Sequence, residues 1–440
     1  MRFLVGERGV VRRKIGDDSL VALWTWKHRA LARSLRSTNL KLATNSTDVN
    51  FVSKNTRIQM LSLNFLIYTV GGVWRPIKWS SNCAKLLYNV FTIVIIVALY
   101  FLVLTQFMDI VLIIDNMDDF ATNSLMFTTI VSVCCKATIA VVRRNAIIDL
   151  IETLLKDPCK PRNKAEMAIQ MKFNEFIRSF SIKYSLLATS SMTSFLIRSV
   201  TNIMQGNLPL RAWLPYDSNE SLMFFWFTSI HQIVALIFAS FINVGTDTLI
   251  FGLFLQTCVQ FEIFECRLQL AINKTARCQK YFSPTSSDNG RTMISRYVGH
   301  HLRIYDYAKT VNSVFNQVLF CQFFGSILIL CTTVYYMSTH ITGSEVATLL
   351  SYIIGMFVQI FVYCWSGNEV ILKSNNVGNA VYNMNWFFLS ISERKDLLMI
   401  MKRSTIPIKF TSSFLITFSL ESYSNVLKTS YSAFNVLQRS

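Results

Sequence analysis

The candidates for catalytic chemistry in this sequence are few, and His301 with Asp306 is the strongest of them. Their spacing is that of a histidine–aspartate dyad for acyl transfer, in which the imidazole would serve as general base. The pair has no companion motif, and one such match is expected by chance in a chain of 440 residues. Phosphate-binding glycine loops, His-Glu-x-x-His and Gly-x-Ser-x-Gly are absent from the sequence. The sequence therefore predicts no catalytic residue, and an enzyme is only a remote alternative.

The ten cysteines provide no metal or redox site. No pair has the spacing of zinc ligands, and none lies in a segment that we expect to be extracellular, where disulfides form. The adjacent Cys134 and Cys135 are interpreted as small packing residues of a membrane helix. The sequence therefore predicts neither a metal nor a cofactor.

Lys136, Arg198 and Asp247 are ionisable residues inside long apolar segments, where charge is unfavourable and often marks function. Lys136 is about two turns from the predicted cytoplasmic end of its segment, so we expect its ammonium to reach water there. Arg198 is expected to reach the outer surface in the same way. Asp247 lies in the inner half of its segment, and we expect its carboxylate to pair with a basic group on a neighbouring helix.

The last apolar segment carries a polar stripe. Glu421, Lys428, Tyr431 and Asn435 recur at helical spacing and share roughly one face. A spanning helix with such a stripe needs water or polar partners along it. Two arrangements meet this need, and the periodicity does not distinguish them. The helix lines an aqueous pore together with helices of other subunits, or it lies inside its own bundle with the stripe paired there.

Seven apolar segments position these residues, and each is long enough to cross a membrane as a helix. Most of the 43 Lys and Arg residues lie in the connections 1–85, 143–178, 256–312 and 367–410. The other connections, 108–118, 205–221 and 340–345, contain only Arg211. Since basic loops remain in the cytosol, the N-terminus is predicted to be cytoplasmic and the C-terminus extracellular. The segments are residues 86–107, 119–142, 179–204, 222–255, 313–339, 346–366 and 411–437.

The expected fold class is therefore all-α, a polytopic membrane protein with seven transmembrane helices. A hydrophobic content of 52% and a mean hydropathy of +0.37 agree with this class. The formal net charge of +18 is concentrated in the cytoplasmic connections, which argues against nucleic acid as a partner.

Parts of the cytoplasmic connections have helical patterns of their own. One pattern over residues 147–155 is broken at Pro158 and Pro161 and resumes from about Asn163. Residues 256–275, 291–312 and 391–405 also have helical patterns. Because these helices carry apolar stripes and extend from the membrane, we favour a subunit interface over surface helices that lie on lipid headgroups.

The outer connection 205–220 has features of a lid. Pro209 and Pro215 stiffen it, and its apolar side chains are expected to fold back over the helices. Asn219 begins an Asn-Glu-Ser sequon on this side and is the predicted glycosylation site.

Motifs within residues 200–440 resemble the odour-tuning subunits of the insect odorant receptor family, and not its common co-receptor. The strongest match is C-terminal, where residues 397–407, 417–420 and 427–437 agree in order. Tyr363-Cys-Trp-Ser-Gly-Asn-Glu and Asp247-Thr-Leu agree in order as well. A gustatory-type chemoreceptor of the same superfamily is the nearer alternative, and a transporter or membrane acyltransferase the remote one. A cytoplasmic N-terminus argues against a G-protein-coupled receptor.

The resemblance implies a ligand-gated, non-selective cation channel in the plasma membrane of sensory neurons, a heterotetramer with co-receptor subunits that requires no G protein. It divides the chain into a cytoplasmic segment 1–85, transmembrane helices over 86–366, a cytoplasmic anchor segment 367–410, and a pore-lining helix with a short extracellular tail over 411–440. The predicted pore or gate residues are Lys428, Tyr431, Asn435, Val436 and Gln438.

The resemblance also implies a ligand pocket in the outer half of the bundle. Such a pocket suits a small, volatile, hydrophobic molecule held mainly by dispersion. The predicted ligand-binding residues are outer-half side chains of spans two, three, four and six: Met126, Phe127, Ile130, Ser191, Ser194, Phe195, Phe224, Phe227, His231, Tyr352 and Met356.

Overall fold

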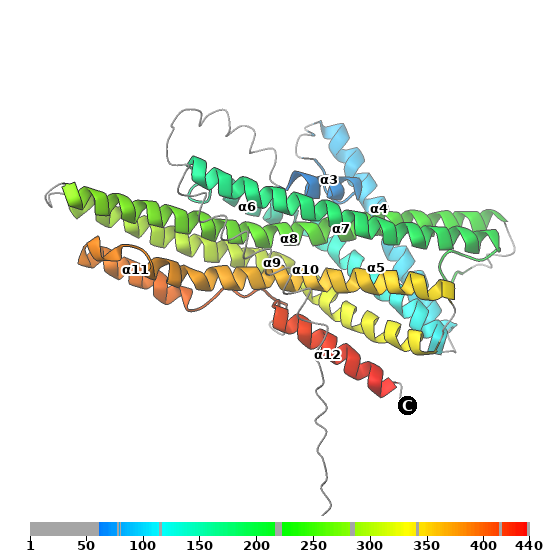
Figure 1. The fold of residues 1–440 in the computed structure, drawn as a ribbon. Helices are drawn as coiled ribbons and strands as arrows, with labels where there is room; N and C mark the ends of the chain where they lie inside the picture. The colour runs from blue at the N-terminus through cyan, green and yellow to red at the C-terminus, as the bar shows by residue number, and fades with distance from the viewer. Residues whose placement is uncertain are drawn as a thin grey trace, which may run out of the picture.

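Long α-helices make up almost the whole structure (Figure 1). The computed structural model describes residues 61–437 except 77–78, 80, 114–116, 216–221, 282–286, 340–342 and 413–415. The all-α prediction is confirmed, and the described strands are two residues each. The elements are α3 (Ser62–Val70), α4 (Asn82–Leu112), α5 (Met117–Val142), α6 (Arg144–Leu155), α7 (Lys164–Met204), α8 (Leu222–Tyr281), α9 (Ser287–Thr339), α10 (Gly343–Tyr382), η1 (Trp386–Phe388), α11 (Ile391–Ser404), β1 (Thr411–Ser412), β2 (Ile416–Thr417) and α12 (Leu420–Leu437).

The centre of the bundle is α8, against which α7 and α10 pack on different sides (Figure 1). Its side chains from Ile242 to Leu268 are almost all buried. With 60 residues at a rise of 1.5 Å each, α8 is about 90 Å long, roughly three times the thickness of a hydrocarbon core. The fourth apolar segment therefore continues as one helix far beyond a bilayer, as its length predicts.

Among the described residues, five helical stretches are long and apolar enough to cross a membrane. They contain the predicted first and fourth spans and overlap most of the second, fifth and sixth. The predicted third and seventh spans fall on α7 and α12, whose polar content is higher because α7 is rich in Ser and Thr and α12 carries Glu421 and Lys428. The five stretches are Asn82–Leu112, Thr122–Val142, Leu222–Thr275, Ile294–Thr333 and Tyr352–Tyr382.

The helical patterns of the connections are confirmed. α6 ends before Pro158, and α7 begins after an extended Asn163. α11 begins with a capping box between Ser390 and Glu393 and packs on α9 and α10 at one end of the bundle (Figure 1). The apolar stripe of α6, with Ile147, Leu150 and Leu154, is fully buried within this chain. That stripe is therefore not available to a partner, because α6 packs on α5 and α9 of its own bundle.

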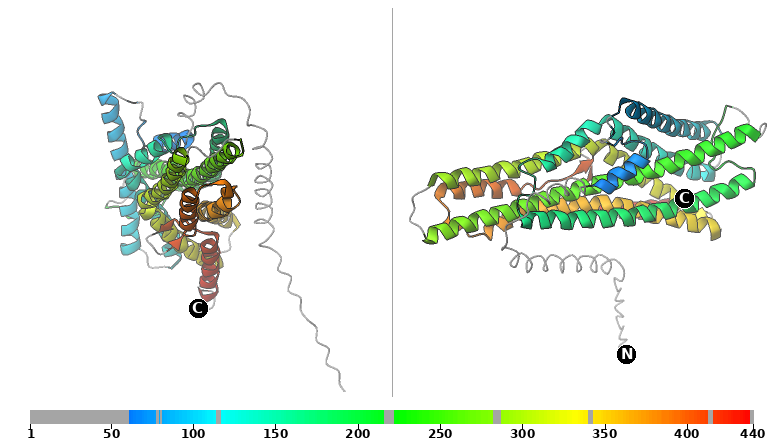
Figure 2. Two further views of the ribbon diagram at one scale, coloured as in Figure 1. Left: turned by 90° about the vertical axis from the view of Figure 1, so that its left-hand side faces the viewer. Right: turned by 90° about the horizontal axis from the view of Figure 1, so that it is seen from above.

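The predicted seventh span, 411–437, is wrong at its start. Its first residues form β1 and β2, in which Thr411 pairs with Thr417, and the helix α12 begins only at Leu420. Aromatic burial explains the difference. Phe410 stacks on Phe254 of α8 at 3.8 Å between ring centroids, and Phe418, with 1% of its surface exposed, packs on Phe323 of α9. These contacts hold the chain against the bundle before α12 projects from its side (Figure 2).

Candidate functional site

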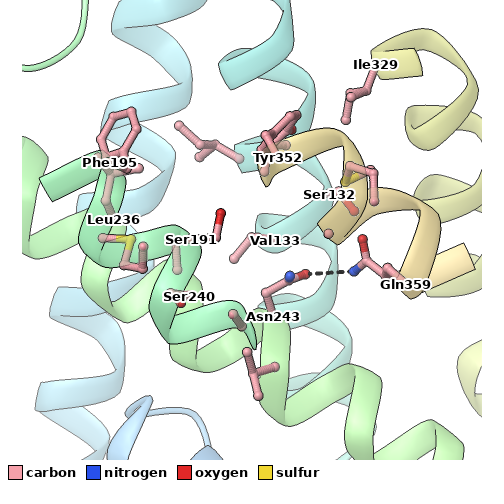
Figure 3. Close-up of a pocket in the computed structure, with 18 of the residues that line it drawn as sticks. Ser132, Val133, Ser191, Phe195, Leu236, Ser240, Asn243, Ile329, Tyr352 and Gln359 are labelled. Carbon is pink, nitrogen blue, oxygen red and sulfur yellow. Dashed lines mark hydrogen bonds between the residues drawn. The ribbon is translucent and has the colours of Figure 1, made fainter. Parts of the chain in front are cut away.

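A cavity of about 190 Å³ lies among α5, α7, α8, α9 and α10 (Figure 3). It is in the half of the bundle where the connection 205–215 joins α7 to α8. A cavity of about 150 Å³ is sufficient for benzene, so this one holds a somewhat larger molecule. Its lining is mainly apolar, and four of its side chains, Ser132, Gln322, Gln359 and Asn243, form a hydrogen-bonded group that makes up its polar end.

The cavity brings together predicted residues from three helices. Met126 and Ile130 come from α5, Ser191 and Phe195 from α7, and Tyr352 and Met356 from α10. The hydroxyl of Tyr352 is hydrogen-bonded to Thr129, which also lines the cavity.

The other predicted residues lie outside the lining. Phe127 packs on Phe107 of α4, and the ring of His231 faces α4, with Nε2 3.2 Å from the carbonyl of Ala98. The remaining three are on exposed faces: Ser194 on α7, where its hydroxyl donates to the carbonyl of Ser190, and Phe224 and Phe227 on α8.

Helix phase explains both what the sequence missed and what it found. The face of α8 that lines the cavity is about two to five turns further along the helix than Phe224 and Phe227, with Leu236, Ser240 and Asn243 at helical spacing. Asp247 lies one turn beyond Asn243 on the same face. An acid within an apolar segment is therefore the sequence signal that could have identified this face of α8. The contribution of α9 was missed as well. Gln322, a buried polar residue within the apolar segment 313–339, is the signal that could have found it, whereas Gly325 has no side chain.

The polar end of the cavity rests on a buried ion pair. Lys136 Nζ lies 2.6 Å from Asp247 Oδ1 and 2.6 Å from Asn243 Oδ1. The Asp247 carboxylate also accepts hydrogen bonds from the hydroxyls of Tyr184 and Tyr363, each at 2.6 Å, and from Gln359 Nε2. Each of the two carboxylate oxygens of Asp247 thereby accepts two hydrogen bonds. These bonds offset the desolvation of both charges.

This pair confirms one expectation for the ionisable residues and overturns another. Asp247 does pair with a basic group on a neighbouring helix, and that group is Lys136. The expectation that Lys136 reaches cytoplasmic water is wrong, since its side chain has no exposed surface. The attraction of the Asp247 carboxylate, together with the hydrogen bond to the amide oxygen of Asn243, exceeds the gain from extending toward water.

The His301–Asp306 pair does not form a dyad. His301 is buried between Phe264 and Tyr305, with ring centroids 5.1 and 5.0 Å away, whereas Asp306 is exposed on another side of α9. Five residues along a helix turn the side chain by about 140°, so the two cannot meet.

The connection 205–215 folds back onto the helices. The amide of Gln232 on α8 accepts a hydrogen bond from the Leu210 N–H at 2.9 Å and donates one to its carbonyl at 3.1 Å. Arg211 pairs with Asp119 of α5 and lies 3.5 Å from Asp109 of α4. Asn219 lies outside the described residues, so its glycosylation stays a prediction.

Gln232→Met is expected to loosen this connection. The substitution keeps the side-chain volume but leaves the buried N–H and carbonyl of Leu210 unpaired, at about 1–3 kcal/mol. Hydrogen exchange of the backbone N–H groups of Leu208 and of residues 210–214 should accelerate by about tenfold or more. Gln205→Met, an exposed position in the same connection, is the control, and equal exchange in both variants would contradict the role of Gln232.

The predicted pore residues lie on α12 or beyond it. Lys428 is exposed, as is Glu421, whereas Val426 and Ser430 are buried against the bundle. Tyr431, Asn435 and Val436 lie within α12, and Gln438 lies outside the described residues.

One helix connects the cavity with α12. α10 lines the cavity with Tyr352, Met356 and Gln359, and one turn further Tyr363 contacts both Asp247 and the Phe418 ring, 6.2 Å away between centroids. Phe361 of α10 lies edge-on to Tyr423 of α12 at 5.4 Å.

Comparisons with known proteins agree with this architecture. The chain is 26% identical over 296 residues to odorant receptor 46a, isoform A, of Drosophila melanogaster, which covers 66% of this chain and 74% of that protein. It is 21% identical to isoform B, over 84% of this chain and 96% of that one. The fold matches the insect olfactory receptor OR5 of Machilis hrabei, solved in complex with eugenol, with a TM-score of 0.75 over 86% of this chain and 97% of that chain, at 16% identity.

A family model described as 7tm Odorant receptor matches residues 116–431. The match includes every helix that lines the cavity as well as the connection to α12. The chain therefore belongs to the insect odorant receptor family, a family of receptors and not of enzymes.

Proposed function

We propose that this protein is an odour-tuning subunit of a ligand-gated, non-selective cation channel in the plasma membrane of sensory neurons. A small volatile molecule binds in the cavity, and the subunit opens a central pore together with co-receptor subunits in a heterotetramer. The single observation that carries the proposal is a largely apolar cavity connected to α12 through α10.

The chemistry of the cavity supports a volatile ligand. Side chains such as Ile130, Phe195 and Met356 offer dispersion contacts, and none of the described residues that line the cavity is charged. The ligand can change the channel only through its different affinity for the closed and open states. Because α10 contacts both the cavity and the start of α12, a change in the position of α10 on ligand binding would be transmitted to α12.

The exposure of α12 supports a pore-lining role. Its polar face, with Glu421 and Lys428, points away from the bundle, and Val426 of the opposite face is buried. We propose that this face meets water in an assembled pore, and that Tyr431, Asn435, Val436 and Gln438 continue it toward the extracellular mouth. Residues 367–410 would then anchor the assembly in the cytosol.

Ser191→Trp tests the cavity as the ligand site. Ser191 points into the cavity (Figure 3), so an indole there occupies the space of a ligand and is expected to weaken odour-evoked currents by about tenfold or more in potency. The measurement is a dose–response of currents in cells that express this chain with the common co-receptor, at matched surface levels.

Ser190→Trp is the matched control, because Ser190 is exposed on the neighbouring face of α7. It should respond as the unmodified protein does. Equal potency in both variants would place the ligand elsewhere, and silence to every volatile of a broad panel, with the protein at the surface, would overturn the proposed function.

A further inference from the structure

The polar end of the cavity contains an amide whose donor is unused. Asn243 lies on α8, facing Gln359 of α10 (Figure 3). Its Oδ1 accepts hydrogen bonds from Lys136 Nζ at 2.6 Å and from Gln359 Nε2 at 3.4 Å. Its Nδ2 has no acceptor among the residues that the structure describes. A side chain of the lining therefore offers an N–H group to whatever fills the cavity.

The ion pair fixes the orientation of this amide. The ammonium of Lys136 can only donate, so the oxygen of Asn243 must face it and the nitrogen must face away. Asp247 in turn holds Lys136 in place from behind the lining. A reversed amide would set its NH₂ against the ammonium, which is unfavourable in a buried site.

The neighbouring amides have no N–H group to spare, because both N–H groups of Gln322 and both of Gln359 are already donated. Gln359 Oε1 accepts a hydrogen bond from Gln322 Nε2 at 3.0 Å, and Gln359 Nε2 is used by Asp247 and Asn243. Gln322 Oε1 accepts from the Ser132 hydroxyl at 3.1 Å. The hydroxyls of Ser191 and Ser240 also line the cavity and can rotate to donate or to accept. The fixed, direction-specific group at this end is thus the N–H of Asn243.

We propose that the ligand of this receptor is a neutral molecule with an apolar body and a hydrogen-bond-accepting oxygen, such as the carbonyl of a ketone, an aldehyde or an ester, which Asn243 Nδ2 binds. The inference rests on the proposed function and names its ligand class. A hydrocarbon in the same position leaves the Asn243 donor unpaired. An acid or an amine meets no counter-charge, because Lys136 and Asp247 already neutralise each other.

The test compares ligands that differ only in the oxygen. In α-methylstyrene a methylene group replaces the carbonyl oxygen of acetophenone, and styrene stands in the same relation to benzaldehyde. Each is a benzene ring with a short substituent, which suits a cavity of about 190 Å³. In cells that express the chain with the co-receptor, the carbonyl compounds should be about two- to tenfold more potent than their hydrocarbons.

Asn243→Leu should bring this ratio close to one, mainly by weakening the carbonyl compounds. Leucine has nearly the shape of asparagine but presents no N–H, and Lys136 keeps its ion pair with Asp247. Ser190→Ala, which removes a hydroxyl from the exposed face of α7, is the control and should keep the ratio. If Asn243→Leu does not reach the surface, the potency ratios of the unmodified protein decide.

Hydrocarbons as potent as their carbonyl partners would overturn the inference, and so would a ratio that survives Asn243→Leu. A response to acids or amines of this size, with none to either carbonyl compound, would overturn it as well while leaving the proposed function intact. Silence toward the entire panel would instead be the failure of the proposed function.

Discussion

Lys136→Met is expected to destabilise the folded protein by about 3–5 kcal/mol, because it leaves the carboxylate of Asp247 buried without its counter-charge. Met has nearly the volume and flexibility of the lysine stem, so packing changes little. The two tyrosine hydroxyls and Gln359 still donate to Asp247, but they do not neutralise it. Thermal unfolding of the detergent-solubilised protein, followed by size-exclusion chromatography with a fluorescent fusion, measures the loss.

A second substitution distinguishes charge from packing. In Lys136→Met combined with Asp247→Asn, the acid is replaced by a neutral group that still accepts hydrogen bonds, so most of the lost stability should return. Lys183→Met is the matched control, since Lys183 is exposed on α7 next to the buried Tyr184. A single variant as stable as this control would contradict the role of the ion pair.

The ion pair also illustrates how much of the structure can be predicted from the sequence. Asp247 in an apolar segment indicates that a partner exists, because a buried unpaired acid is too unfavourable. Its identity depends on how α5 packs against α8, which brings together residues 111 positions apart. Because Lys136 is near the end of its own segment, its sequence position suggests that the ammonium extends to water. Only the tertiary contact with Asp247 shows that it does not.

The cavity and the last helix depend on packing in the same way. The family resemblance implies a pocket in the outer half of the bundle, and hydropathy and charge identify that half of each helix, so Met126, Ser191 and Met356 could be predicted to line a cavity there. The face of each helix depends on its rotation in the bundle, which is why Phe227 lies on the exposed side of α8. The start of α12 depends on aromatic contacts with α8 and α9, which a local pattern over 411–437 does not contain.

Gly367→Ala is expected to uncouple the cavity from α12. A Cβ on Gly367 of α10 would lie 2.5 Å from the carbonyl oxygen of Phe418 and 2.8 Å from its Cβ, so the backbone before α12 must move. The same change in a helix with free space stabilises by about 0.5–1 kcal/mol, and any loss therefore comes from the clash. Overpacking of this kind costs about 1–3 kcal/mol.

If the contact between α10 and Phe418 carries the ligand's effect, a shift of this size changes the odour-evoked current by about fivefold to a hundredfold. Currents of the variant, recorded with the co-receptor and normalised to surface protein, measure the change. Gly299→Ala in α9 is the control, because nothing lies within 4 Å of the added Cβ, and its currents should equal those of the unmodified protein. The clash displaces the backbone at Phe418, where the chain before α12 contacts α10. Unchanged currents in Gly367→Ala would therefore mean that the ligand's effect reaches α12 through a different contact.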